Sequence, residues 1–396
     1  MRIFRQNSLL LTSMGSSEIY YKPHNRYVAS NFEVGELMAK SPRTIFNWSN
    51  FAPYERRYGG QDLNGKTVCI YRHSAWGDQL ITSALPRYLK TLYPDATVHM
   101  YCHPKVLSLW KLNMFVSGSA IPLPIPFDAV RDVYDYHIFF EGMLEADSEK
   151  DQENCYDSMF SFCGFRDVPP HFKRPYIFPL PSDYEFFNSL VLPSKFILYH
   201  LAPNNFNRCY PIEKGVELVK RMVRTFGLPV VVIGSVEEKY KHFVGMFDNI
   251  PNVTNVTGMC KDFRDVIPFV EKASLLICPD SSIMHMAACF PHVPVISLWG
   301  LFDPNDRIKY YPNSYPIFNK DVCPVAPCRC HDFDLPLTDC VNAVNVVNKS
   351  DISWCPVLDS ISVEDIIRVI VDNQLLNDGY GSDEVHMQND RKEVGV

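Results

Sequence analysis

The sequence predicts an α/β protein made of two doubly wound halves, and three observations support this. Strand-like runs alternate with helix-like runs from residue 66 onward, a pattern typical of parallel sheets covered by helices. The alternation stops in a proline-rich stretch at residues 167–194 and then starts again. Polar residues directly follow several of the predicted strands. Two such halves would face a central cleft at the carboxyl ends of both sheets, where ligands usually bind.

The first half contains the elements of one such sheet. A buried strand is expected at 66–72, followed by a helix at 79–92, and a second strand at 97–103. A helix near 105–112 and a strand at 134–140 complete this half.

The second half repeats the pattern at greater length. Strands are expected at 196–201, 229–234, 275–278 and 293–299, and helices at 212–226, 237–247, 262–272, 282–289 and 363–373. The resulting division is an N-terminal extension at 1–60, a first domain at 61–180 and a second domain at 181–376, which includes a Cys-rich segment at 319–356. The polar composition of residues 377–396 predicts a disordered tail.

Composition and charge exclude several classes of protein. Of the 396 residues, 46% are hydrophobic and 21% charged, which is ordinary for a globular chain, and no apolar run approaches a membrane span. Thirteen cysteines without a secretion signal favour a reducing compartment, so we expect a cytoplasmic protein. Residues 1–77 carry ten Lys/Arg against five Asp/Glu within a total of −7, and many aromatics. This segment could either pack onto the first domain or bind a negatively charged acceptor substrate.

Asp78 is the candidate catalytic residue of the first half. It follows the turn His73–Gly77 that ends the first strand, and it begins the next helix. A carboxylate in this place can simply cap the helix. Alternatively, it points into the cleft and accepts a proton from an acceptor hydroxyl as a general base.

Two loops of the second half carry residues suited to a nucleotide. Asn204 and Arg208 lie between a strand and a helix that follows Pro211, where a cation and backbone dipoles favour a diphosphate. Ser235 and Glu238 follow the next strand, and a carboxylate there can accept hydrogen bonds from ribose hydroxyls. A surface arginine and a solvated first-turn glutamate are the alternatives.

A third loop gives the strongest signal. A buried strand leads into Asp280, Ser281 and Ser282 at the start of a helix, where backbone N–H groups and small hydroxyls form a cradle for phosphate. His285 lies one turn along the same helix. A lone helical histidine is usually a core residue, but this clustering favours a functional role.

These motifs together resemble glycosyltransferase family nine, the family of the ADP-heptose:lipopolysaccharide heptosyltransferases. The segments that carry the resemblance span roughly residues 65–376 in the family's order: GDQLITSALPRYLKTLYPDATV, VVVIGSVEEK, NVTGMCKDFRDVIPFVEKASLLICPDSSIMHMAACFPHVPVISLWGLFDP and SISVEDIIRVI. The Asp-Ser-Ser-x-x-His block is the most specific of them. Trp76 departs from the family, which usually has a small residue before Gly-Asp, and residues 1–60 have no counterpart in it.

The resemblance implies a GT-B fold of two Rossmann-like domains, with the acceptor on the first domain and the nucleotide sugar on the second. It implies inverting, metal-independent transfer of a hexosyl, pentosyl or heptosyl group, with Asp78 as the base and Trp76, Gly77 and Gln79 beside the acceptor. Arg208 would lie near the donor phosphates and Glu238 at the ribose. Met259 would flank the nucleobase, and the block from Asp280 to His285 would hold sugar and phosphates.

Five cysteines lie close together near the C-terminus: Cys323, Cys328, Cys330, Cys340 and Cys355. Four thiolates can hold zinc, but the spacing of this Cys323–Cys340 cluster differs from the usual zinc knuckles, so structural thiols are favoured. Together with the resemblance, this leads us to expect no required cofactor and no catalytic metal. The co-substrate would be a nucleotide-diphosphate sugar.

Three functions follow from the sequence. The first is sugar transfer to a bacterial surface glycan such as a lipopolysaccharide core. The second is a bacteriophage enzyme that glycosylates a hydroxymethylated DNA base, which the basic, aromatic first segment would hold outside the stack. The third is a non-catalytic scaffold that binds a nucleotide sugar. A dehydrogenase is excluded, because no strand runs into a Gly-x-Gly-x-x-Gly turn.

Overall fold

The computed structural model divides into two compact units, Met1–Phe178 (unit 1) and Pro179–Val396 (unit 2). The structure describes residues 2–6, 10–14, 17–22, 25–29, 33–34, 37, 45–50, 56–73, 75–139, 141, 153–201, 206–235, 244–328 and 354–376. Among these residues, no helix is both long enough and apolar enough to cross a lipid bilayer.

Unit 1 is built on a parallel sheet whose strands lie in the order β10-β6-β7-β8. The strands are β6 (Thr67–Tyr71), β7 (Thr97–Cys102), β8 (Ile121–Pro122) and β10 (Tyr136–Phe139). After β6, the chain adds β7 and β8 on one side of it and then returns to place β10 on the other. The sheet therefore has a topological switch point between the carboxyl ends of β6 and β10, where ligands bind in such folds.

Helices connect the strands of unit 1. They are α2 (Trp76–Thr82), α3 (Ala84–Leu92), the 3₁₀ helix η2 (Pro104–Trp110), α4 (Phe127–Val133) and α6 (Cys155–Phe162). The single helix expected at 79–92 is thus two helices that meet at Ser83. Pro86 accounts for the break, because it has no N–H to donate to the carbonyl of Thr82.

Residues 1–60 contribute strands to unit 1. The sequence predicts an extension here, but no strands. β5 (Ile45–Asn50), β1 (Arg2–Gln6), β4 (Arg26–Ala29) and β9 (Ile125–Pro126) form an antiparallel sheet in that order, and β2 (Leu10–Met14) pairs with β3 (Ser17–Tyr21). Tyr21 and Val28 share one buried cluster with Cys69 and Tyr101 of the parallel sheet. The first segment therefore completes the core of unit 1.

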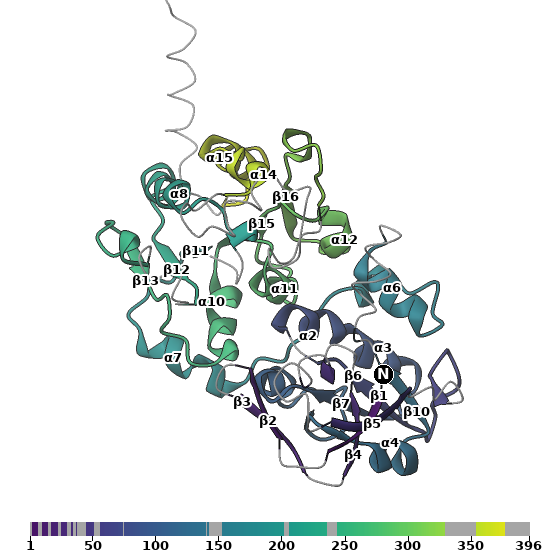
Figure 1. Ribbon diagram of the computed structural model, residues 1–396. Helices are drawn as coiled ribbons and strands as arrows, with labels where there is room; N and C mark the ends of the chain where they lie inside the picture. The colour runs from purple at the N-terminus through teal and green to yellow at the C-terminus, as the bar shows by residue number, and fades with distance from the viewer. Residues whose placement is uncertain are drawn as a thin grey trace, which may run out of the picture. The chain divides into compact units, whose positions relative to one another are not determined.

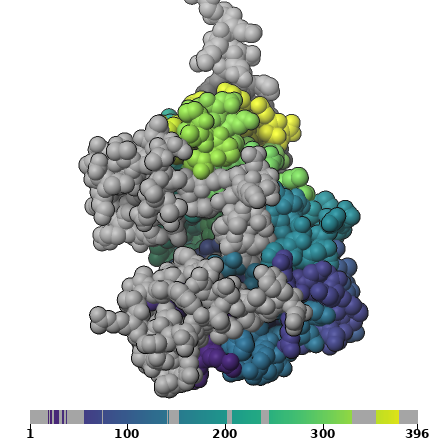
Figure 2. Space-filling view, turned by 45° about the vertical axis from the view of Figure 1, so that its right-hand side comes forward, coloured from purple at the N-terminus to yellow at the C-terminus, as the bar shows by residue number. Residues whose placement is uncertain are grey.

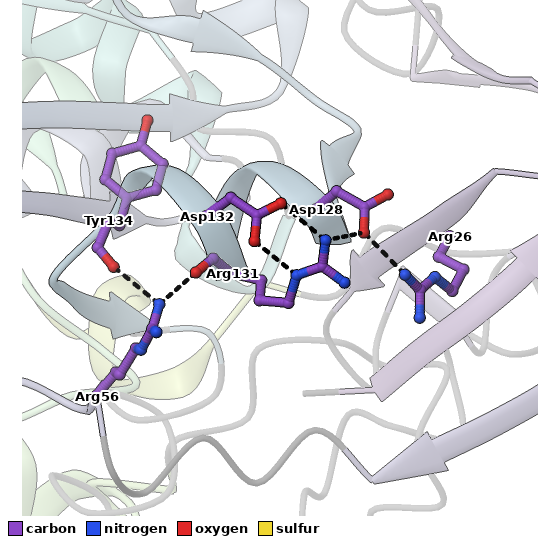
Figure 3. A network of polar contacts seen from close by, with 6 residues as sticks. All are labelled: Arg26, Arg56, Asp128, Arg131, Asp132 and Tyr134. Carbon is purple, nitrogen blue, oxygen red and sulfur yellow. Dashed lines mark hydrogen bonds and ion pairs between the residues drawn. The ribbon is translucent and has the colours of Figure 1, made fainter.

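An exposed network links this segment to α4 (Figure 3). Arg26 lies 2.8 Å from Asp128, and the same carboxylate lies 3.1 Å from Arg131. Arg131 also pairs with Asp132 at 2.6 Å, while Arg56 donates to the main-chain carbonyls of Arg131 and Tyr134. Arg26 and Arg56, the two arginines of the basic segment in this network, thus have hydrogen-bond acceptors within unit 1.

Unit 2 is built on a six-stranded parallel sheet in the order β13-β12-β11-β14-β15-β16 (Figure 1). The strands are β11 (Ile197–His200), β12 (Val230–Ile233), β13 (Val253–Asn255), β14 (Leu275–Pro279), β15 (Val295–Leu298) and β16 (Ser314–Ile317). If these strands are numbered 1 to 6 along the chain, their order in the sheet is 3-2-1-4-5-6, the arrangement of dinucleotide-binding folds. The switch point lies between β11 and β14.

Helices of unit 2 include α7 (Tyr184–Ser189), α8 (Ile212–Phe226), α10 (Ile267–Lys272), α11 (Ser282–Ala287), α12 (Pro304–Ile308), α14 (Pro356–Asp359) and α15 (Val363–Asp372). α8 ends at Gly227, whose φ of 64° is the left-handed conformation that glycine adopts readily. α15 begins with a capping box between Ser362 and Asp365 and packs against α8 (Figure 1). The helix expected at 237–247 lies largely outside the described residues; its end is the 3₁₀ helix η7 (Gly245–Phe247).

The proline-rich stretch is fastened to unit 2 by a buried ion pair. Asp183, in the 3₁₀ helix η4 (Pro181–Asp183), accepts hydrogen bonds from Nε of Arg264 at 2.8 Å and from Nη2 at 2.6 Å. The two side chains are 3% and 5% exposed. A fork of two charge-assisted bonds fixes the orientation of the pair. The part of the linker after Phe178 is therefore an ordered part of unit 2.

The two described ends of the Cys-rich segment lie together on unit 2. Asn319 donates to the hydroxyl of Ser360 at 3.1 Å, which joins the chain before residue 329 to α14. In Figure 2, the green surface of this part lies beside the yellow surface of α14 and α15. Cys330, His331 and Cys340 lie outside the described residues.

Candidate active site

A buried arginine occupies the switch point of unit 1. Arg72 directly follows β6, and its side chain is only 1% exposed. Its Nη2 lies 2.9 Å from Oδ2 of Asp78, and its Nη1 lies 3.9 Å from Oε2 of Glu141, which comes after β10. One guanidinium therefore faces two carboxylates at the edge of the sheet where ligands bind.

Asp78 is held in the first turn of α2 and remains partly accessible, with 31% of its side chain exposed. It does not cap the helix: the N-cap residue is Ala75, and no side chain bonds the first N–H groups. Ala75 has φ 64° and ψ 128°, a conformation that costs a non-glycine residue strain and is found most often at functional sites. The strained turn places the Asp78 carboxylate against Arg72.

Gln79 supports this arrangement from inside the protein. Its side-chain amide donates to the carbonyl of Arg72 at 2.9 Å and accepts from Nε1 of Trp110 at 2.8 Å. Gln79 is fully buried, so it has no surface to offer an acceptor, contrary to the expectation from sequence. Trp76 and Gly77, the other residues expected near an acceptor, are half-buried at the start of α2.

Two histidines lie beside Arg72. The rings of His73 and His103 are 5.4 Å apart, and the main-chain N–H of His73 donates to Oε2 of Glu141 at 2.8 Å. Burial, followed by the charges of His103 and Arg72, lowers the pKa of His73 to about 4. His73 is therefore uncharged at neutral pH, and the charge at this edge belongs to Arg72 and the carboxylates.

The switch point of unit 2 joins residues from three places in the chain. Nδ1 of His200, the last residue of β11, lies 3.2 Å from the hydroxyl of Ser281, which follows β14. Asp280 lies next to it, with Oδ2 3.8 Å from Nη1 of Arg208. Nε of Arg208 is buried and has no hydrogen-bond partner among the residues that the structure describes. A buried donor of this kind calls for a ligand or a water molecule.

Two histidines at this edge contact hydroxyl groups. Burial lowers the pKa of His200 to about 4, so its imidazole is uncharged at neutral pH. His285 lies in α11, and its Nδ1 is 2.7 Å from the hydroxyl of Tyr311. Both residues are buried. Tyr311 thus orients the one histidine that the sequence singled out.

Other residues expected at the donor lie at the same carboxyl edge of the sheet or outside the described part. Ser235 is exposed just after β12, and Met259 is 47% exposed in the loop after β13. Ser282 is the first residue of α11. Asn204 and Glu238 lie outside the described residues.

Sequence reasoning did not identify Arg72, His200 or Tyr311. For two of them a signal was present: Arg72 and His200 are the first polar residues at the ends of the buried runs VCIY and ILY. The contact of Tyr311 with His285 depends on tertiary packing.

In the described part of the Cys-rich segment, burial raises the pKa of the Cys355 thiol, and the nearby Cys328 and Cys323 add to the rise. Among the residues that the structure describes, no group of three or more His, Cys, Asp or Glu side chains is placed to hold a metal ion. These three thiols alone therefore do not fit a metal site, and no chemical step is assigned to one.

Residues 180–329 match the family model of glycosyltransferase family 9 (heptosyltransferase). No curated protein matches the chain in sequence. Among solved structures, the chain is similar to a glycosyl transferase family 9 protein from Veillonella parvula, with 14% identity, a TM-score of 0.59 and coverage of 81% of this chain and 99% of the other.

Two Escherichia coli structures are also similar. One is ADP-heptose lps heptosyltransferase II, with 15% identity, a TM-score of 0.53 and coverage of 78% of this chain and 98% of the other. The second is TibC, a dodecameric iron-containing heptosyltransferase in complex with ADP-D-beta-D-heptose, with 13% identity, a TM-score of 0.53 and coverage of 94% and 90%. At these identities the similarity establishes the fold: α/β with parallel sheets, in the GT-B class, as the sequence predicted.

Proposed function

We propose that this chain, whose residues 180–329 match the family model of glycosyltransferase family 9, is an inverting enzyme that moves a sugar from a nucleotide diphosphate to an acceptor hydroxyl. Unit 2 binds the donor through the cluster at its switch point, and unit 1 supplies the base. The observation that carries the proposal is the unsatisfied Nε of Arg208, which lies beside Asp280 at the donor edge.

Arg208 is suited to the donor diphosphate. Its nearest described carboxylate, on Asp280, is 3.8 Å away, beyond hydrogen-bond distance, so the charge of the guanidinium is only partly compensated. A phosphate oxygen accepts well from such a group, because both the charge and the planar donor geometry match. Ser281, held by His200, offers a hydroxyl to the same diphosphate.

Asp78 is suited to act as the general base. The acceptor oxygen attacks the anomeric carbon, its proton passes to the free oxygen of Asp78, and the bond from the anomeric carbon to the diphosphate breaks. The nucleoside diphosphate leaves with the bonding electrons, and Arg208 offsets its charge. A single displacement of this kind inverts the anomeric centre. In this scheme the cation at the leaving group is an arginine, so transfer proceeds without a metal.

The printed names of the solved relatives suggest which donor and acceptor to test. Two of them name ADP-heptose as donor, and one names lps as acceptor. We therefore propose an ADP-linked sugar and a bacterial surface glycan. The DNA alternative rested on the basic first segment, but Arg26 and Arg56 of that segment are matched by a carboxylate and by main-chain carbonyls. This favours the glycan.

A binding experiment tests the donor site. The melting temperature is followed with ADP, GDP, UDP and CDP and with ADP-heptose, in the presence of a chelator and after addition of divalent metal. We expect one nucleotide to raise the melting temperature regardless of chelator, and Arg208→Gln to weaken its binding by about tenfold or more. Arg368→Gln removes an equal charge from the exposed face of α15 and is the matched control. Equal binding by Arg208→Gln and wild type would remove Arg208 from the site.

A transfer assay tests the base. Asp78→Asn keeps an oxygen that can accept from Arg72 but cannot take a proton, so we expect turnover to fall by about 10²–10⁴ with donor affinity unchanged. Near-normal turnover of Asp78→Asn would contradict the assignment. A wild-type chain that binds the donor but transfers to neither glycan nor hydroxymethylated DNA would support the scaffold alternative instead.

A further inference from the structure

We propose that Arg72 is a positioning residue of the transfer reaction: it holds the Asp78 carboxylate in the orientation in which its free oxygen meets the acceptor hydroxyl. This inference rests on the proposed function of Asp78 as the base. Three observations carry it: the geometry of the contact, the rigidity of the arginine, and the difference in exposure between the two partners.

The contact engages one side of the carboxylate. Nη2 of Arg72 lies 2.9 Å from Oδ2 of Asp78, a charge-assisted hydrogen bond of normal length. With Oδ2 held, the second oxygen of Asp78 belongs to a side chain that is 31% exposed, whereas the arginine itself is 1% exposed. The pair therefore combines a partly accessible carboxylate, held through Oδ2, with a cation that stays buried.

The arginine is held at its own backbone. Its N–H donates to the carbonyl of Tyr101 on β7 at 3.2 Å, and its carbonyl accepts from the buried Gln79 at 2.9 Å. Nη1 points toward Glu141 at 3.9 Å, and Glu141 is itself bonded to the main-chain N–H of His73 at 2.8 Å. These bonds hold the main chain of Arg72, and the charge of Glu141 attracts its guanidinium. A positioning residue held in this way needs little reorganisation when the reaction occurs.

The second carboxylate explains why an arginine is required. A guanidinium has separate N–H groups in one plane and can face Asp78 and Glu141 at the same time, whereas a lysine ammonium is a single point charge on a flexible stem. A lysine at position 72 would keep the charge but lose the fixed direction. The Arg72→Lys variant therefore tests whether the fixed direction of the guanidinium matters in addition to its charge.

The experiment compares kcat, KM and donor affinity for Arg72→Lys, Arg72→Met, Asp78→Asn and the double variant Arg72→Lys/Asp78→Asn. We expect Arg72→Lys to lower kcat by about tenfold and Arg72→Met by about 10²-fold, with KM for the donor within about twofold of wild type. Because Arg72 acts through Asp78, the double variant should be no slower than Asp78→Asn alone, a non-additive result.

Arg264→Lys is the matched control, because Arg264 is also a buried arginine paired with a carboxylate but lies outside the switch points. It should lower the melting temperature without changing kcat of the folded enzyme. If Arg72→Met does not fold, the lysine variants carry the test alone.

The outcomes separate this inference from the proposed function. Unchanged kcat in a folded Arg72→Lys and Arg72→Met, or losses that multiply in the double variant, would overturn the positioning role while leaving the transferase intact. A wild-type chain without transfer activity would overturn both.

Discussion

Among the described residues, each unit contains one buried arginine paired with an aspartate, and the two pairs differ in exposure. Arg264 and Asp183 in unit 2 are 5% and 3% exposed and share two hydrogen bonds. Arg72 and Asp78 in unit 1 share one contact, and the aspartate is 31% exposed. The first pair is closed and can only hold the chain together. The second leaves part of its carboxylate accessible, as a group that must meet a substrate requires.

The two switch points also differ in the charged groups that they contain. In unit 1 a guanidinium faces two carboxylates. In unit 2 the neutral His200 and also His285 contact hydroxyls, and the charge of Arg208 is only partly compensated by Asp280. An edge that takes up a proton needs an accessible carboxylate, and a hydrogen bond from a neighbouring arginine can orient it. An edge that binds an anion needs a cation with spare donors and neutral neighbours that do not repel the ligand.

The largest change in stability is expected when the buried pair of Arg264 and Asp183 is broken. Arg264→Met leaves the carboxylate of Asp183 buried without its partner, so we expect unfolding to become easier by about 3–5 kcal/mol. Denaturant unfolding measures this change. Donor affinity of the folded protein should stay as in wild type, and a loss below about 1 kcal/mol would contradict the view of this pair as a structural clamp.

A second prediction concerns pH and the neutral edge of unit 2. The pKa of His200 lies at about 4 instead of 6.5, so the unfolded chain takes up a proton first as pH falls. Stability is therefore complete above pH 6.5 and is lost as pH falls toward 4, by about 3 kcal/mol for this residue.

His200→Asn removes that proton and keeps a polar group beside Ser281, so its unfolding free energy should depend less steeply on pH between 6.5 and 4. His73 and His137, whose pKa values are also lowered to about 4, and His99, whose pKa burial also lowers, contribute to the slope that remains. Parallel curves for the variant and wild type would contradict the burial of a neutral His200.

A smaller effect is expected from Tyr311→Phe, which removes the hydroxyl bonded to His285 and preserves the ring. Loss of one buried hydrogen bond should cost about 1–2 kcal/mol of stability and raise KM for the donor more than it lowers kcat. Steady-state kinetics with varied donor separates the two. An effect on kcat alone would place His285 in the chemical step and not in donor binding.

The smallest effect is expected from the exposed network of Figure 3. Asp128→Asn removes a carboxylate that faces Arg26 and Arg131 on the surface of unit 1. Exposed ion pairs are weakened by water and salt, so the melting temperature should not change measurably. A clear decrease would show that this network helps to hold residues 26–29 onto α4.

Much of the fold was predictable because its signals are local. The runs KTVCIYR and LLICP are apolar at every buried position of a strand, and the helix at 212–226 ends before Gly227 as expected. The short strands β13 and β16 were missed, because three or four residues carry too little periodicity. The strands of residues 1–60 were missed as well, although β2 pairs locally with β3; of the described strands there, only β4 has a partner far along the chain, at Ile125 and Pro126.

The sequence by itself determined that two sheets of parallel strands would form and that polar residues would gather where those strands end. Hydrophobic periodicity is local, and parallel strands all end at the same edge. Only the tertiary structure decided which polar residues meet. His200 reaches Ser281 across 81 positions because β11 pairs with β14, and Arg72 faces Glu141 because β6 pairs with β10. Such pairings depend on packing of the whole sheet, which no single segment encodes.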